Sequence, residues 1–410
     1  MRRTDILVLW AALFLQFFLL DAVPAAAGEM TFEREYTYQA GEADSKLSCR
    51  AIALEQVKRL LLEELGTYLE SMTEVKNSRL TKDQITTLTA GAVQARIIDE
   101  KWDGQTYRIR ARIKADPDEV AKAVQGMKED RQKRQGLEDA RRRADEAMKE
   151  IQRLRAELEA LKEGTRPDTL KKYGEAVREL SAADWFQKAA GLVDSQKPQE
   201  AIEAFNKAIE LDPKYGQAYN GRGFMHLILG DLQQALRDFT QSIQFDPRNP
   251  EPYNNRGIIH GRMGDMEKAL QDHSRAVELG PGQWSYYQNR GLVYYEMGKI
   301  PEGMRDFTLA IDRNPGGYEL YYFRGNGFMG LKKYAEAIPD YQEAIRLNPD
   351  YDPALFNLAC AYSLIGKGEL ALPHLERAIR LKPENREAAI KDKDFDSLRL
   401  LPAFKKLVGQ

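Results

Sequence analysis

The chain has 410 residues, of which 43% are hydrophobic and 30% are charged, and its formal net charge is −2. This length is enough for two or three domains. The near-neutral balance gives no electrostatic basis for a nucleic-acid partner and no strongly basic face for an anionic membrane. The two cysteines, Cys49 and Cys360, are too few for a disulfide framework, so we expect two buried thiols.

Residues 1–27 have the pattern of a secretory signal peptide. Arg2 and Arg3 precede an apolar run over 6–20, and the small residues 25–28, AAAG, follow it. A positive start, a short apolar core and an A-x-A site are typical of such peptides. We expect cleavage after Ala27, no integral membrane span after cleavage, and an exported product, in the periplasm of a Gram-negative bacterium. An uncleaved anchor is the alternative.

Residues 28–117 are predicted to form a small α+β domain. The segment 31–38, TFEREYTY, alternates as a half-buried strand does, and 43–71 carries apolar residues at helical spacing. Two further alternating runs flank Asp103-Gly104, which is a strong hairpin signal. The hairpin WDGQTY, residues 102–107, resembles one in small domains of bacterial envelope lipoproteins and flagellar outer-ring proteins. That resemblance implies an envelope setting.

Residues 118–164 are charge-dense and carry a heptad pattern. The two apolar positions of that pattern hold Leu137, Ala144, Ile151 and Leu158, and Ala140, Ala147, Leu154 and Leu161. One interpretation is a coiled coil that makes a homodimer through residues 119–163. The other is a long helix that packs on its own chain. A linker helix is expected over 165–181.

From residue 182 the sequence repeats every 34 residues. Six units fit without a gap: 182–215, 216–249, 250–283, 284–317, 318–351 and 352–385. Position 32 of each is proline, position 20 is Ala or Gly, and the motif YNNRG at 253–257 recurs with small changes at the same place in the neighbouring units. Fixed periods of this length indicate stacked helical repeats.

The repeat pattern resembles the tetratricopeptide repeat family and covers about half the chain. Positions 4, 8 and 11 form one helical stripe and positions 20, 24 and 27 another, as an antiparallel helix hairpin requires. The predicted fold class is mostly α: an α-solenoid of six hairpins with a capping helix over 386–410. Pro339 and Pro373 stand inside second helices, where we expect a kink or a late helix start.

Arginine at position 7 and aspartate at position 23 occur together in the four middle repeats. The hairpin places these positions at one height, so we expect a structural ion pair in each middle repeat or between neighbours. The expected pairs are Arg222 with Asp238, Arg256 with Asp272, Arg290 with Asp306, and Arg324 with Asp340.

The family resemblance implies that positions 2, 5, 6, 9, 12 and 13 of each first helix line a concave groove that binds a protein or peptide. Carboxamides recur on this face and can grip an extended backbone, and Phe224 adds apolar contact. The residues expected to bind the partner are Asn220, Asn254, Asn255, Gln288, Asn289, Tyr295, Asn326 and Asn357. Ordinary polar surface is the alternative interpretation.

No catalytic motif is found, so we expect no enzyme, no cofactor and no metal. His226, His260 and His273 stand at core positions, and the alternating Asp392, Asp394 and Asp396 lack the glycine and glutamate of a calcium loop. The sequence thus favours a non-enzymatic exported scaffold that binds a protein or peptide in cell-envelope assembly. The alternative is an envelope polysaccharide- or peptidoglycan-associated factor that aids an enzyme complex.

Overall fold

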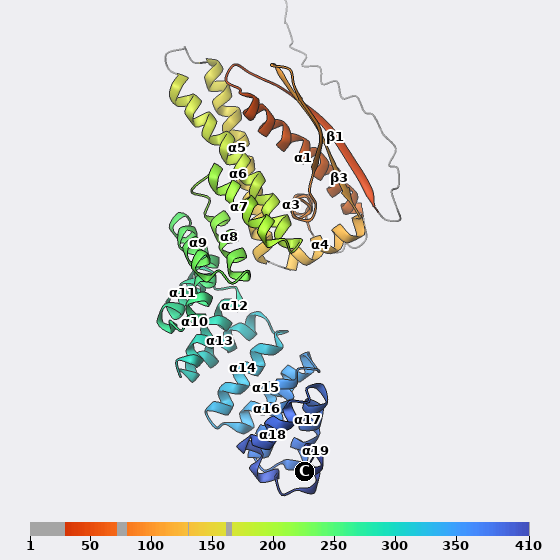
Figure 1. Ribbon diagram of the computed structural model, residues 1–410, viewed down its shortest axis with the longest axis vertical. Helices are drawn as coiled ribbons and strands as arrows, with labels where there is room; N and C mark the ends of the chain where they lie inside the picture. Colours follow the sequence, from red (N-terminus) through yellow and green to blue (C-terminus); the bar gives the residue numbers. More distant parts are fainter. Residues whose placement is uncertain (1–28, 72–79, 130, 161–165, 410) are drawn as a thin grey trace, which may run out of the picture. The chain divides into compact units, whose positions relative to one another are not determined.

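The computed structural model describes residues 29–71, 80–129, 131–160 and 166–409 (Figure 1). The predicted signal peptide, residues 1–27, lies outside the described residues. The chain divides into two compact units, the first comprising residues 1–197 with 210–212 and the second 198–209 with 213–410. Among the described residues, no helix has both the length and the apolar character needed to cross a membrane.

The first unit contains a three-stranded antiparallel sheet in the order β1-β3-β2. Its strands are β1 (Met30–Gln39), β2 (Arg96–Trp102) and β3 (Thr106–Ala115). In β3 every second residue is buried, because one face of the sheet packs against helix α1 (Lys46–Ser71). The β2–β3 turn has Gly104 at φ 99°, a conformation that favours glycine, as the Asp-Gly signal predicts.

A helix that the sequence interpretation missed, α3 (Lys82–Ala92), packs beside α1. Thr81 and Gln84 form a capping box at its start: the Thr81 hydroxyl accepts from the Gln84 amide, and the Gln84 side chain accepts from Thr81 N. The sequence signal for the start of this helix was the pattern T-x-x-Q before an apolar run.

Among the described residues of this unit, three further helices follow the sheet: α4 (Pro117–Glu129), α5 (Arg131–Ala160) and α6 (Arg166–Asp194). The heptad residues of α5 from Leu137 to Leu158 are buried in the same core as α1 and the sheet, and α5 packs along α6. Leu161 lies outside the described residues. The seam therefore packs on its own chain, which is the second of the two interpretations, and α6 runs from the expected linker into the first repeat without a break.

A buried carboxylate connects these helices to the sheet. Asp44, whose side chain is 1% exposed, accepts hydrogen bonds from the Gly41 amide and from the Tyr38 and Tyr173 hydroxyls. Arg155 of α5 donates to the Tyr38 hydroxyl at 2.6 Å and lies over its ring. Since Tyr173 is on α6, this network holds β1, α5 and α6 together.

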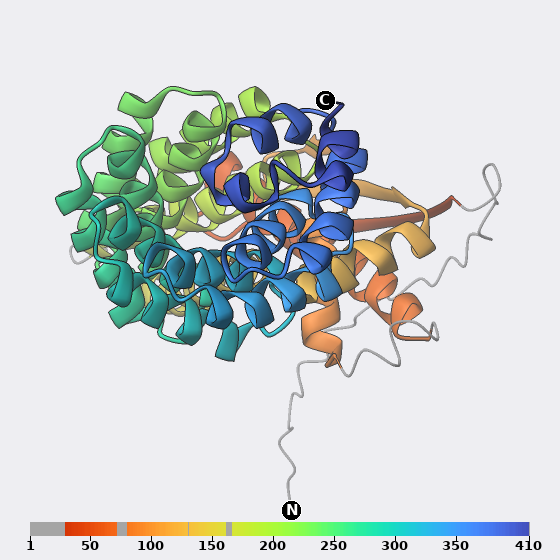
Figure 2. The same ribbon diagram turned by 90° about the horizontal axis from the view of Figure 1, so that it is seen from below.

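The second unit is a solenoid of helix hairpins (Figure 2). Its helices are α7 (Pro198–Leu211), α8 (Gly216–Ile228), α9 (Leu232–Phe245), α10 (Pro250–Arg262), α11 (Met266–Leu279), α12 (Trp284–Glu296), α13 (Ile300–Arg313), α14 (Tyr318–Gly330), α15 (Tyr334–Leu347), α16 (Asp352–Leu364) and α17 (Gly368–Leu381). From α8 on, every first helix begins at position 1 and every second helix at position 17. The predicted mostly α fold class, with its repeat solenoid, is confirmed.

The turn between the two helices of a repeat has positive φ at position 15. Glycine supplies this conformation four times, for example at Gly230 and Gly264 with φ 83° and 81°. In the fifth repeat Lys332 adopts the same positive-φ conformation, at φ 58°, although it has a side chain that disfavours this conformation. The next residue often caps the second helix, as Asp231 does by accepting from the Gln234 amide.

The late helix start expected at the two internal prolines is wrong. Helices α15 and α17 begin at Tyr334 and Gly368, at the same repeat position as the others, and run through Pro339 and Pro373. Proline removes one backbone hydrogen bond there, but each helix also buries a full stripe of side chains against its partner, and this packing outweighs the loss.

The expected single capping helix over 386–410 is replaced by three short elements. They are α18 (Asn385–Lys391), the 3-10 helix η2 (Lys393–Leu398) and α19 (Pro402–Val408). Phe395 and Phe404 are buried against α16 and α17, so the segment covers the last repeat as expected. Asp392, which caps η2, and Pro402, which starts α19, divide it into separate elements.

Each of the four Arg–Asp pairs forms within its own repeat and is bidentate. Arg290, for example, places Nε 2.7 Å from Asp306 Oδ2 and Nη2 2.8 Å from Oδ1. The aspartate side chains are 5–7% exposed and the arginines 18–22%. In three repeats the remaining Nη1 donates to position 25 of the preceding repeat, as Arg222 does to Asn206 at 2.7 Å. The arginine therefore joins two repeats as well as two helices.

We predict that Asp306→Ala lowers the free energy of unfolding by about 3 kcal/mol, because it leaves the Arg290 guanidinium without its carboxylate in a largely buried position. Urea denaturation of the full chain, followed by circular dichroism, measures this loss. The double variant Arg290→Ala/Asp306→Ala should lose less than the two single variants add up to. The exposed neighbour Arg305→Ala is the control, and an equal loss there would contradict the prediction.

Candidate protein-binding face of the repeats

We define the groove face as positions 2, 5, 6, 9, 12 and 13 of the first helices α8, α10, α12, α14 and α16. These helices pack against their own second helix with the opposite side. In α10 and α12, for example, the core side is formed by Gly257 and Gly291 at position 8, next to His273 and Phe307. The eight carboxamide and tyrosine residues predicted to bind a partner all belong to the groove face.

The asparagines of this face form hydrogen bonds between successive repeats. Asn255 Nδ2 donates to Asn220 Oδ1 at 3.2 Å, and Asn289 Nδ2 donates to Asn254 Oδ1 at 2.9 Å. Asn254 and Asn255 are only 7% and 5% exposed. This set, which we call the amide ladder, therefore holds the repeats together, and its two central members are not open to a ligand.

The same linking role appears at the fifth and sixth repeats. Asn326 Oδ1 accepts from Asn357 Nδ2 and from the Tyr341 hydroxyl, both at 2.8 Å. Gln288 is half-buried and belongs to no such link. Of the predicted carboxamides, Gln288 is the one whose polar group the structure does not bind to a neighbouring repeat.

Tyr295 is also part of the packing between repeats. Its hydroxyl donates to the main-chain carbonyl oxygen of Phe323 at 3.0 Å, and its ring meets Phe307 edge-on. Phe323 in turn stacks on the fully buried Phe307, with ring centroids 5.4 Å apart. Burial raises the pKa of Tyr295. The ring thus supports the α12–α14 contact rather than an open binding surface.

Apolar side chains are exposed on the groove face of the second repeat. Phe224 and Ile228 of α8 are 41% and 58% exposed and stand four residues apart, on one side of the helix. Position 9 continues with Ile258 and Leu292 in the next two repeats, both half-buried. We call Phe224, Ile228, Ile258 and Leu292 the apolar row. The sequence interpretation included Phe224 but missed Ile228, whose signal was its i+4 spacing.

Of the three histidines expected at core positions, His273 is deeply buried, whereas His226 and His260 are half-buried. His273 is 2% exposed, and its Nδ1 lies 3.2 Å from Asn254 Oδ1, so the ring extends the amide ladder into the repeat core. Burial, followed by the nearby Arg290, lowers the pKa of His273 to about 4. The ring is therefore neutral at pH 7.

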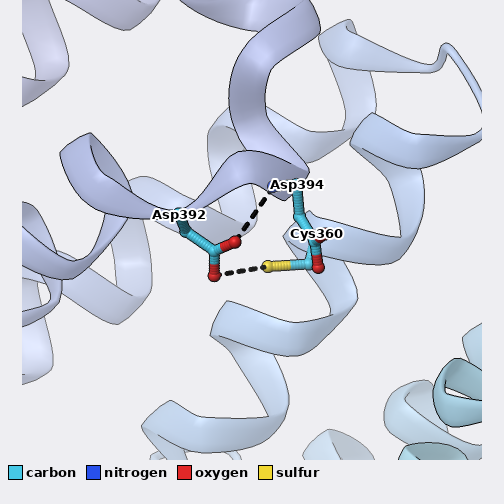
Figure 3. A group of neighbouring side chains, drawn as sticks. All are labelled: Cys360, Asp392 and Asp394. Carbon is cyan, nitrogen blue, oxygen red and sulfur yellow. Dashed lines mark hydrogen bonds between the residues drawn. The ribbon is translucent and has the colours of Figure 1, made fainter.

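One group of possible metal ligands occurs among the described residues. Cys360 of α16, Asp392 and Asp394 have donor atoms within 4.8 Å of one another (Figure 3). The Cys360 thiol is buried and donates to Asp392 Oδ2 at 3.9 Å, while Asp392 Oδ1 accepts from the Asp394 amide at 3.0 Å. Burial raises the pKa values of Cys360 and Asp394. These bonds connect the last repeat to its cap.

The sequence interpretation had noticed the alternating aspartates but not their contact with Cys360. The signal was the repeat length of 34 residues: Asp392 follows Cys360 by 32 residues, which is close to one repeat, so the cap lies near the place of a next first helix. Ser363 and Ser397, which are 34 residues apart and 3.1 Å apart between hydroxyl oxygens, show the same relation.

Comparison with known proteins identifies the repeats. Models described as "Tetratricopeptide repeat" match residues 182–215, 204–237, 318–351 and 340–372, and a "TPR repeat" model matches 225–264. No curated protein matches the chain. The matched ranges 182–215 and 318–351 coincide with two of the six units read from the sequence.

Solved structures with a similar arrangement include YrrB, described as a TPR protein with an unusual peptide-binding site (20% identity, 45% of this chain and 94% of that one, TM-score 0.41). Pseudomonas aeruginosa PilF shares 17% identity over 54% of this chain and 97% of its own, with a TM-score of 0.47. MamA from Desulfovibrio magneticus RS-1 shares 19% identity over 41% and 96%, with a TM-score of 0.39.

We predict that stability falls in acid through His273. Its folded pKa of about 4 lies below the unfolded value of about 6.5, so its contribution is present above pH 6.5 and is lost as the pH falls toward 4. Between pH 7 and pH 5 the unfolding free energy should drop by about 2 kcal/mol more in the wild type than in His273→Phe. Phe239 and Phe307 show that phenylalanine fits this position.

Urea denaturation at the two pH values measures this difference. His226→Gln is the matched control, because His226 is half-buried in the first helix of the preceding repeat. An acid loss that persists unchanged in His273→Phe would show that another group causes it.

Proposed function

Because tetratricopeptide repeat models match residues 182–264 and 318–372, we propose that the chain is a non-enzymatic adaptor that binds a protein or peptide partner on the groove face. The observation that carries this proposal is the apolar row. Phe224 and Ile228 are exposed to solvent on a face whose polar groups are largely engaged in the amide ladder. Apolar area of this kind is stabilised by covering it, at about 25 cal/mol per Å².

This face favours a partner with apolar side chains. Across α8, α10, α12, α14 and α16, Arg262 is the one cation at groove-face positions, whereas Glu251, Glu296 and Glu319 are anionic. A face with this charge balance does not suit an acidic peptide tail. In place of the amide-lined grip on a peptide backbone that the sequence led us to expect, we propose side-chain contact with the apolar row.

The setting we propose is the cell envelope, in the periplasm of a Gram-negative bacterium, where the adaptor would serve assembly. The support is the signal-peptide pattern of residues 1–27 together with the hairpin resemblance at 102–107. Homodimerisation through residues 119–163 would require the α5 seam to leave α6 and the core it shares with α1. We therefore do not include a homodimer in the proposal.

The binding proposal predicts a loss of ligand in the double variant Phe224→Asp/Ile228→Asp. Selection of phage-displayed random peptides on the immobilised full chain should enrich peptides with regularly spaced apolar residues. Their affinity should fall by about tenfold or more in the variant, because two buried carboxylates would replace the apolar contact. Fluorescence anisotropy with the enriched peptides measures it.

The matched control is Leu309→Asp, which changes an exposed leucine on the second helix α13. That variant should bind as the wild type does. Peptides that bind equally to Phe224→Asp/Ile228→Asp, or no enrichment at all, would contradict the groove-face assignment.

The export proposal predicts that the mature protein begins at Gly28. N-terminal sequencing of the protein from a periplasmic fraction tests this, and deletion of residues 2–27 should leave the protein in the cytoplasm. A full-length product retained with the membranes would instead support an uncleaved anchor.

A further inference from the structure

We propose that the free edge of β2 in the first unit binds an extended polypeptide strand whose side chains are alternately acidic and apolar. This site is separate from the groove face and does not depend on the function proposed for the repeats. Three features carry it: an open strand edge, exposed isoleucines on that edge, and a surplus of positive charge on the adjoining sheet face.

The edge is open because β2 is the last strand of the sheet. In the order β1-β3-β2, it pairs on one side with β3, and β3 is the one element with which it makes extensive contact in the described part of the chain. The main-chain N–H and C=O groups on its other side can accept a further strand. Ile97 and Ile98, at an irregularity in the ladder, are 37% and 38% exposed.

The outer face of the sheet, opposite to α1, is cationic. The register places six cations on it, namely Arg96, Lys101, Arg108, Arg110, Arg112 and Lys114, against three carboxylates, Glu33, Glu35 and Asp99. The whole chain is slightly negative, so this surplus is local. Four of the six cations stand on β3 and two on β2, whereas two of the three carboxylates belong to β1.

The carboxylates already present do not neutralise this face. Glu33 accepts from Arg112 at 2.9 Å and lies 3.7 Å from Arg110, so one carboxylate serves two guanidiniums. Arg96 and Lys114 have no ion-pair partner among the residues that the structure describes. Arg96 stands on the edge strand itself, where a cation without such a partner favours an acidic ligand.

The strand edge selects a polypeptide. Main-chain hydrogen bonds along an edge can be satisfied by another strand and not by a lipid headgroup or a phosphodiester. The outer-face positions also carry no aromatic ring on which nucleic-acid bases could stack.

The side-chain pattern of the strand follows from the pleat. Successive side chains of an added strand point to opposite faces. Those on the outer face would lie across from Arg96, Asp99 and Lys101, and Asp99 is 3.9 Å from Lys101. Since two of these three residues are cations, acidic residues are favoured there. Those on the other face would lie beside Ile97, where apolar residues are favoured.

Fluorescence anisotropy with the full-length protein and a fluorescein-labelled peptide of alternating glutamate and valine tests the proposal. Saturable binding is expected. Two control peptides keep the composition: one groups the glutamates and valines in two blocks, and one is N-methylated at its backbone amides. Both should bind about tenfold more weakly or not at all, since the first loses the alternation and the second the hydrogen-bond donors.

The variant Arg96→Glu/Lys101→Glu should lose about tenfold or more in affinity for the alternating peptide. Its matched control, Lys46→Glu/Lys122→Glu, reverses two exposed charges on α1 and α4 and should bind as the wild type does. Circular dichroism verifies that both variants are folded.

Three outcomes would overturn the proposal. One is equal binding of the N-methylated peptide, which would remove the edge from the interaction. Another is retention on phosphatidylglycerol vesicles or heparin that the alternating peptide does not compete away. The third is self-association abolished by Arg96→Glu/Lys101→Glu in sedimentation, which would assign the edge to a second copy of the chain.

Discussion

The close approach of the two helices at position 8 is the constraint on which the four middle repeats depend. A Cβ atom at Gly223, Gly257 or Gly325 would lie 2.8–2.9 Å from the ring at position 24 of the second helix. Absence of that atom lets the backbones come close enough for positions 7 and 23 to form the bidentate Arg–Asp pair beside the crossing. The Arg–Asp pair, in turn, opposes sliding of one helix along the other, because sliding would leave a buried carboxylate without its guanidinium.

This crossing also decides which groups remain for a partner. Because position 8 faces inward, positions 5 and 6 of neighbouring first helices come close to each other. Their asparagine side chains therefore form hydrogen bonds with one another in the amide ladder. Buried carboxamides must be hydrogen-bonded, so Asn254 and Asn255 serve the stacking. The side chains left to solvent stand further along the helix, at Phe224 and Ile228, and this exposure is the basis for proposing an apolar partner.

The features that could be predicted from the sequence are those that recur every 34 residues. Helix boundaries, the Arg–Asp pairs and the positive-φ turn each repeat several times, so one pattern supports all copies. The bonds of the amide ladder could not be predicted in this way, because each joins residues 35 apart, such as Asn220 and Asn255, and this relation is visible only when two repeats are superimposed. The heptad pattern of α5 could not choose between a second chain and α6, because both would bury the same seam.

The two units use their main-chain hydrogen bonds differently, and this determines what each can recognise. In a helical repeat the main-chain N–H and C=O groups are hydrogen-bonded within each helix. Its surface can therefore distinguish partners by side-chain contacts alone. In the part of the chain that the structure describes, the three-stranded sheet leaves one edge of β2 unpaired, so that edge is suited to select a strand conformation first and its side chains second. An adaptor with both surfaces can distinguish a partner by sequence at the repeats and by conformation at the sheet, without any change in its own fold.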